Sequence, residues 1–308
     1  MLKLFKRGQQ LTVLAMVVAQ ALGLAQALHP IFDSFAQFRL HITALLIPSV
    51  ALLLLARSWK LSAAAALAMA AGLLTMAPAI PNRDAAPATA ADLVLMQFNT
   101  LFDNRAPQAI VDQVEALRPD VITLQEVSSQ TLVILSILAK DYPYQIQCPF
   151  SAAGAVAVLS KWQPSRQGCE KGLGLAWLEM NPGGKKITVA SLHLHWPFPF
   201  RQASQISALQ QSLRSLPRPV LLSGDFNAVP WSHAVARIAE MTGTRVAGGL
   251  RMTLKLALKL SNFGIRPVAI LPIDQVLLPP GATAAIAMGQ DAGSDHLPVI
   301  ARITLAKE

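Results

Sequence analysis

Residues 219–232 read PVLLSGDFNAVPWS. The apolar start predicts a buried strand, and the glycine before Asp225 predicts a tight turn at its end. Asp225 and Asn227 then stand two positions apart, so a carboxylate and an amide lie side by side at that end. An ordinary Asx turn would explain this stretch taken alone. Its meaning therefore depends on what the neighbouring strands carry.

Several other short apolar stretches end at a polar cluster in the same way. They are 93–99, 121–127, 155–160, 187–195, 273–278 and 297–305. Helical spacing of apolar residues predicts helices over 106–119 and 201–216. Strands interleaved with helices indicate an α/β domain. Pattern alone favours a doubly wound parallel sheet.

Polar side chains mark the ends of these strands. They are Asn99, Glu126, His193, Asp225, Asn227, Asp274, Asp295 and His296. A carboxylate at the end of a buried strand is costly unless it is paired or binds a metal. Gathered at one edge of a sheet, these oxygen ligands suit Mg²⁺ or Mn²⁺. The histidines are too few, and no cysteine is near, for a zinc site.

Seven ordered motifs resemble those of the endonuclease/exonuclease/phosphatase superfamily. They are QFNT, PDVITLQEV, GAVAVLS, SLHLHWP, GDFNAVP, IDQVL and SDHLPV, and the likeness covers about residues 92–305. The resemblance implies an α/β four-layer αββα sandwich, in which two mostly antiparallel sheets pack face to face with helices outside. It also implies hydrolysis of phosphate esters with Mg²⁺ or Mn²⁺.

The resemblance carries roles onto the matching metal and water-activating positions. Glu126 matches the family's metal carboxylate, and Asp295 is expected to be the second ligand. Asp225 is expected to orient or deprotonate the attacking water, while Asn227 and Asn99 contact phosphate or water.

The remaining roles concern histidines. His296 is expected to donate to a phosphoryl oxygen, with Asp274 orienting its ring. His193 is preferred over His195 as the residue that assists the leaving group, and His195 would then line the rim. The sequence shows no acidic partner for His193, and Gln275 replaces the His or Tyr of many members.

Composition separates the chain into two parts. Of its 308 residues, 53% are hydrophobic and 14% are charged, against about 25% in soluble domains. Residues 1–80 hold six Lys or Arg and one acid, Asp33, whereas the rest holds 20 basic and 16 acidic residues. Disorder, collagen and small disulfide scaffolds are excluded. A net charge of +4 on the second part is too modest to favour DNA.

The first part is predicted to be a membrane anchor, residues 1–80, with spans at about 11–28, 39–57 and 61–80. A cleaved signal peptide is the alternative for the first span, and a re-entrant hairpin is the alternative for the other two. Basic residues before the first span and between the last two place the N-terminus inside. Residues 81–92 are predicted to be a flexible linker, and residues 93–308 a domain outside the cytoplasm.

Two further features have two interpretations each. Cys148 and Cys169 form either a disulfide, as an extracytoplasmic compartment allows, or two buried thiols. Segment 249–267 alternates basic residues with leucines. It is either a flap that gathers lipid or phosphate, or a half-buried strand or helix with a solvated face.

The sequence thus predicts a membrane-anchored, metal-dependent phosphoesterase on the periplasmic side of a bacterial inner membrane. Its expected partners are the lipid bilayer and a phosphate ester, from nucleic acid, phospholipid or inositol phosphate. No obligate protein partner is inferred. The alternative is a non-catalytic, membrane-tethered binding module that retains the fold.

Overall fold

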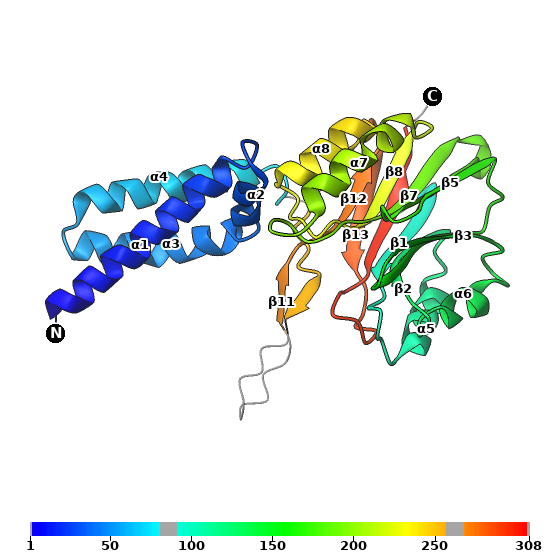
Figure 1. Ribbon diagram of the computed structural model, residues 1–308, viewed down its shortest axis with the longest axis horizontal. Helices are drawn as coiled ribbons and strands as arrows, with labels where there is room; N and C mark the ends of the chain where they lie inside the picture. The colour runs from blue at the N-terminus through cyan, green and yellow to red at the C-terminus, as the bar shows by residue number, and fades with distance from the viewer. Residues whose placement is uncertain (1, 81–90, 257–267, 307–308) are drawn as a thin grey trace.

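The protein consists of a helical bundle followed by an α/β domain (Figure 1). The computed structural model describes residues 2–80, 91–256 and 268–306. The predicted linker therefore lies almost wholly outside the described residues.

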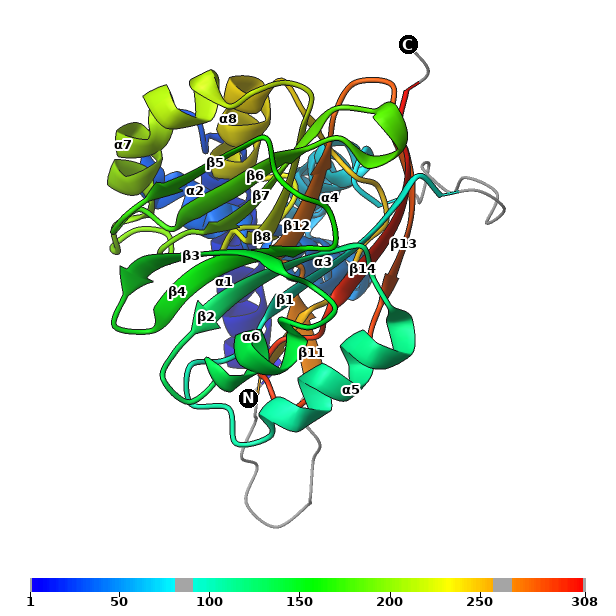
Figure 2. The same ribbon diagram turned by 90° about the vertical axis from the view of Figure 1, so that its right-hand side faces the viewer.

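Two six-stranded sheets form the centre of the α/β domain and pack face to face (Figure 2). The first sheet has the order β13 (Thr283–Met288), β14 (Val299–Thr304), β1 (Leu93–Asn99), β2 (Val121–Val127), β4 (Gly154–Ser160) and β3 (Tyr144–Ser151). The second has the order β5 (Arg166–Glu170), β6 (Leu175–Met180), β7 (Ile187–His193), β8 (Val220–Asp225), β12 (Asp274–Leu278) and β9 (Arg245–Val246).

Helices cover the outer face of each sheet, which makes four layers (Figure 2). Helices α5 (Pro107–Leu117) and α6 (Val133–Leu138) pack on the first sheet through Ile110, Val114 and Ile134. Helices α7 (Gln202–Ser215) and α8 (His233–Thr242) pack on the second. A short 3₁₀ turn (Pro182–Gly184) precedes β7. The two-sheet α/β sandwich is thus confirmed.

The doubly wound parallel sheet that pattern alone favoured is wrong. Only β1–β2 and β7–β8 pair in parallel, and the remaining described pairs are antiparallel. A buried strand is apolar throughout in either arrangement, so its composition does not reveal the direction of its neighbour.

A disulfide joins Cys148 of β3 to Cys169 of β5. Each strand lies at the edge of its own sheet, so the bond ties the two sheets together along one side. The disulfide interpretation of the two cysteines is the one that the structure supports.

The bundle consists of α1 (Leu2–Leu24), α2 (Pro30–Ala36), α3 (Arg39–Leu55) and α4 (Trp59–Met76). Among the residues described, α4 is long and apolar enough to cross a bilayer, and α2 with α3 forms a second such stretch if their 56° bend is allowed. Helix α1 does not qualify, since Gln9, Gln10 and Gln20 interrupt its apolar sequence. The prediction of three spans therefore stays a prediction.

Polar groups inside the bundle bond one another. The amide of Gln20 donates to Thr43 Oγ1 at 3.0 Å and to the Ala68 carbonyl at 3.4 Å, which links α1 to α3 and α4. A Cβ at position 72 would collide with both Gln20 and Thr43, so the close approach of these helices requires Gly72.

Polar contacts also fix α2 to the α/β domain. The buried carboxylate of Asp33 accepts from the backbone N–H groups of His233 and Ala234, at 3.0 and 2.9 Å, at the start of α8. Trp231 Nε1 donates to the Ala36 carbonyl at 2.9 Å, and the Val229 N–H donates to Gln37 Oε1 at 3.1 Å. The bundle thus holds the loop that follows β8.

Candidate functional site

The ends of parallel strands bring the central side chains together. His193 and Asp225 end β7 and β8 and lie directly opposite each other in the parallel register. A Cβ on Gly224 would collide with the backbone of Leu192, so glycine is what allows the two strands to approach here. Asn99 and Glu126 lie at the corresponding ends of β1 and β2 in the facing sheet.

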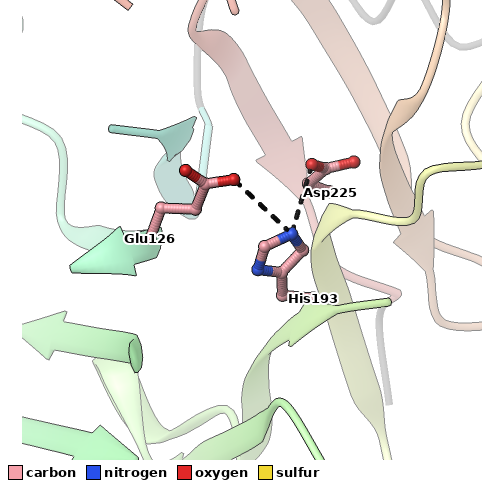
Figure 3. A group of neighbouring side chains, drawn as sticks. All are labelled: Glu126, His193 and Asp225. Atoms are coloured by element: carbon pink, nitrogen blue, oxygen red, sulfur yellow. Dashed lines mark ion pairs between the residues drawn. The ribbon is translucent and has the colours of Figure 1, made fainter. Parts of the chain in front are cut away.

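Three of these side chains converge on one point (Figure 3). His193 Nε2 lies 3.5 Å from Asp225 Oδ2 and 3.9 Å from Glu126 Oε1. These acidic partners of His193 are not evident in the sequence, because they come from a neighbouring strand and from the facing sheet. Glu126 and Asp225 are both among the strand-end residues that the sequence predicts for the site.

Asn99 connects the two carboxylates. Its Nδ2 donates to Asp225 Oδ2 at 2.9 Å and to Glu126 Oε1 at 3.1 Å. The second oxygen of Glu126 accepts from the Phe102 N–H at 2.9 Å. These donors offset part of the repulsion between two carboxylates that share one site.

Two of the site residues have left-handed backbone conformations. Glu126 has φ +58° and Asn227 has φ +46°, values that cost energy for residues other than glycine. Glu126 lies at an irregularity in the pairing of β2 with β4, and Gly154 leaves room for it, since a Cβ there would meet the Glu126 and Val127 backbone. Such strain is typical of functional positions.

His296 is held by a carboxylate on the other side of the site. Its Nδ1 lies 2.7 Å from Asp274 Oδ2, and its Nε2 lies 3.7 Å from Asp225 Oδ2. Burial disfavours the imidazolium, but Asp274 and Asp225 outweigh it and raise the pKa of His296 to about 10. His296 is therefore a cation at neutral pH.

The two central carboxyl groups differ in their titration. Burial raises the pKa of Glu126, although His193 and Asn99 oppose the shift. Burial also acts to raise the pKa of Asp225, but His296 and His193 hold that pKa below its ordinary value. Asp225 is thus the more readily ionised of the two.

Asn227 follows Asp225 in the same loop and contributes an unused acceptor. Its N–H donates to Asp225 Oδ1 and its Nδ2 donates to the Leu194 carbonyl, both at 2.8 Å. Its Oδ1 is buried and has no hydrogen-bond partner among the described residues. The amide oxygen is therefore available to a water or a substrate.

A cavity of about 170 Å³ is lined by Glu126, His193, Asp225, Asn227 and His296. His195 lines it beside His193, as expected of a rim residue, and Asp295 lines it as well. The ring of Phe150 packs on both histidines, with centroids 5.0 Å from His193 and 4.8 Å from His195. Phe150 belongs to the edge strand β3, YQIQCPFS, whose alternating pattern predicts a strand but does not mark this ring as a site residue.

The donor set fits a divalent cation. Ligand atoms of Glu126, His193 and Asp225 lie within 4.8 Å of one another, and so do those of Asp225, Asp274 and His296. The first group supplies two carboxylates, the ligands that Mg²⁺ and Mn²⁺ favour, whereas in the second His296 is a cation bound to Asp274 and is not a ligand. The carboxylate of Asp295 is not part of either group, so its role as second ligand stays a prediction.

Two departures noted in the sequence have structural explanations. Gln275 is buried and donates to the carbonyls of Ala228 and Pro272, so it supports the loop after β8. In the basic segment, β10 (Leu254–Leu256) pairs with β11 (Val268–Leu271), and Lys255 pairs with Asp291. The rest of that segment, 257–267, lies outside the described residues.

The site combines carboxylates and histidines that could hold a metal, and an unused amide acceptor lies beside them. This arrangement between two packed sheets is that of a metal-dependent phosphoesterase. The profile of the endonuclease/exonuclease/phosphatase family matches residues 96–296. The chain belongs to this family and is a metal-dependent hydrolase of phosphate ester bonds.

Solved structures share this fold. TDP2 from D. rerio, complexed with a single-strand DNA product, has a TM-score of 0.54 at 16% identity and covers 69% of this chain and 99% of its own. A mutant of beta toxin from Staphylococcus aureus with bound magnesium ions has a TM-score of 0.53 at 14% identity, covering 70% and 100%. Truncated TDP2 from Caenorhabditis elegans has a TM-score of 0.51 at 19% identity, covering 68% and 96%.

No curated protein matches the sequence. Identities this low show the fold alone, so the substrate has to be inferred from the site itself.

Proposed function

We propose that this chain is a membrane-anchored phosphodiesterase or phosphomonoesterase whose site opens outside the cytoplasm. The observation that carries the catalytic part is the convergence of Glu126, His193 and Asp225 at 3.5–3.9 Å. Its substrate is a phosphate ester of a nucleic acid or of a phospholipid headgroup.

The roles of the acids follow from their contacts. A divalent cation held by Glu126, with Asp295 as second ligand, would polarise a phosphoryl oxygen and offset its developing charge. Asp225, the more readily ionised carboxylate, orients or deprotonates the attacking water, and Asn227 Oδ1 accepts a hydrogen bond from it. Asn99 bridges the two carboxylates by donating to both.

The two histidines act on the other phosphate oxygens. His296, a cation held by Asp274, donates to a non-bridging oxygen. His193 gives a proton to the leaving oxygen, and Phe150 packs against the ring and limits its movement. The accepted and donated protons balance in one hydrolytic turnover.

The bundle geometry supports anchoring. The end of α1, the start of α3 and the end of α4 lie on the side of the α/β domain, while the α3–α4 turn lies at the opposite end (Figure 1). At that opposite end Lys6 Nζ donates to the Ala56 carbonyl, next to Arg57. Basic residues thus gather at the end away from the domain, as they do on the cytoplasmic side of a membrane.

Replacing Asp225 by Asn in the detergent-solubilised full chain tests the catalytic proposal. We expect hydrolysis of bis-p-nitrophenyl phosphate with Mg²⁺ to fall by about 10²–10⁴-fold, because the variant cannot accept the proton of the attacking water. The matched control is Asp112→Asn, which changes an exposed acid on α5. Equal rates for the two variants would refute the assigned role.

A further inference from the structure

The loop between β7 and α7, residues 194–201, connects the active site to the bundle. His195 and Trp196 line the catalytic cavity at one end of this loop. Further along, the Phe198 carbonyl accepts from Ser34 Oγ of α2 at 2.8 Å, and the Phe198 ring lies edge-on to the His29 ring, with centroids 6.0 Å apart. The rim of the site is therefore in contact with the predicted anchor.

This loop exposes three aromatic rings. Trp196 is 44% exposed, Phe198 43% and Phe200 65%. Leu28, at the bundle end beside them, is 79% exposed. Aromatic side chains at the end of a membrane span favour the level of the lipid headgroups, where their rings leave water without entering the hydrocarbon.

The position of the loop matches that level. It touches the 29–34 segment, which lies between the first two predicted spans on the side of the α/β domain (Figure 1). A membrane crossed by α3 and α4 would therefore have its surface beside this loop. The membrane surface is therefore the partner that these rings would meet.

A cavity next to the catalytic cavity is poor in charge. This second cavity, of about 650 Å³, shares Phe150 and Ser151 with the catalytic cavity, and its lining includes Val127, Leu132 and Pro149. The described residues that line the two cavities include no Lys or Arg. A nucleic-acid backbone needs such cations along its path, whereas a lipid phosphate ester does not.

We propose that Trp196, Phe198 and Phe200 form a bilayer contact that presents the active site to phosphate esters of membrane lipids. This inference rests on the proposed function and names its substrate class. The loop 194–201 lies in the headgroup layer. The cavity lined by Val127, Leu132 and Pro149 binds the portion of the lipid attached to the phosphate.

Tryptophan quenching tests the contact without using activity. The full chain is reconstituted in vesicles of phosphatidylethanolamine and phosphatidylglycerol that contain brominated lipid. We expect Phe200→Trp to add emission that bromine quenches. Ile137→Trp is the matched control, because Ile137 is 42% exposed on α6, on the far side of the domain from the bundle (Figure 1). Equal quenching of the two added tryptophans would overturn the contact.

Activity tests the substrate class in the same vesicles. We expect Phe200→Ser to lower release of lipid headgroup phosphate roughly tenfold, since the ring that would be partly buried in the bilayer is lost. Hydrolysis of bis-p-nitrophenyl phosphate should stay unchanged. Ile137→Ser should change neither rate. The ratio of lipid hydrolysis to bis-p-nitrophenyl phosphate hydrolysis for each variant corrects for differences in the amount of protein reconstituted.

The outcomes separate the two proposals. Wild-type vesicles that hydrolyse bis-p-nitrophenyl phosphate but no lipid would overturn the lipid assignment and leave the proposed function standing. Vesicles inactive on both substrates would contradict the proposed function, and quenching at position 200 would still decide the bilayer contact.

Discussion

Asp274 links His296 to a network of buried polar side chains. Its Oδ2 bonds His296, and its Oδ1 accepts from Gln97 Nε2 at 2.8 Å. Gln97 comes from the facing sheet and also donates to Gln125, whose amide donates to Ser191 Oγ. A buried polar network thus crosses between the sheets under the catalytic residues and fixes the orientation of His296.

Asp274→Asn tests this arrangement through pH. The raised pKa, about 10, keeps His296 protonated through neutral pH, and its charge is lost only as pH rises through that value. Removing the Asp274 charge lowers the pKa, so the basic limb of the rate profile should move to lower pH. We expect about a hundredfold loss near pH 8, measured as kcat/KM between about pH 6 and pH 10. An unshifted limb would contradict the role.

At the residue scale, the predicted residues that the structure brings together are those whose position has few ordinary explanations. A carboxylate at the end of a buried strand is expensive, so Glu126, Asp225 and Asp274 stood out. Gln97 and Phe150 did not, because a buried glutamine or an edge-strand phenylalanine has many ordinary uses. Their importance depends on which strand of the other sheet they face.

At the scale of elements, the disulfide has a clear position. It joins the two edge strands β3 and β5, so each sheet is held at an edge that its own hydrogen bonds leave open. It closes a loop with a sequence separation of 21 residues.

Replacing both cysteines by alanine should lower the free energy of unfolding by about 3 kcal/mol, because the unfolded chain regains the freedom of that loop. Denaturant unfolding of the full chain in detergent measures the change. Reducing the wild-type protein should give the same loss. If the variant and the oxidised wild type were equally stable, the bond would be structurally unimportant.

The buried strands could be predicted almost to the residue, and several edge elements could not. Strands β1 and β2 coincide with the expected 93–99 and 121–127, since both begin with apolar residues and are buried along most of their length. Strand β5, RQGCE, is polar and partly exposed, so its composition does not distinguish it from a loop. The direction in which the strands pair was implied only by the resemblance to the family, because hydrophobic periodicity does not distinguish parallel from antiparallel pairing.

At the scale of the whole molecule, the proposed membrane orientation rests on the position of the basic residues. Lys6 and Arg57 lie at the bundle end away from the α/β domain. The number of spans could not be fixed from sequence, because Gln20 reduces the apolar character of α1 even though its amide is bonded inside the bundle.

A topology reporter tests the placement of the domain. Alkaline phosphatase, which needs an oxidising compartment, should be active when fused after Glu308, because the three predicted crossings would put that end outside. A cytoplasmic reporter at the same position should be inactive and is the control. Activity of the cytoplasmic reporter alone would refute the extracytoplasmic location.

The contact between Asp33 and the start of α8 also sets an order of events during biosynthesis. The N–H group of His233 is 200 residues further along the chain than the carboxylate that accepts from it. At ribosomal rates of 5–20 residues per second, roughly 10–40 s separate the synthesis of the two partners. The four bundle helices are therefore synthesised well before α8, so this contact can form only late in the synthesis of the chain.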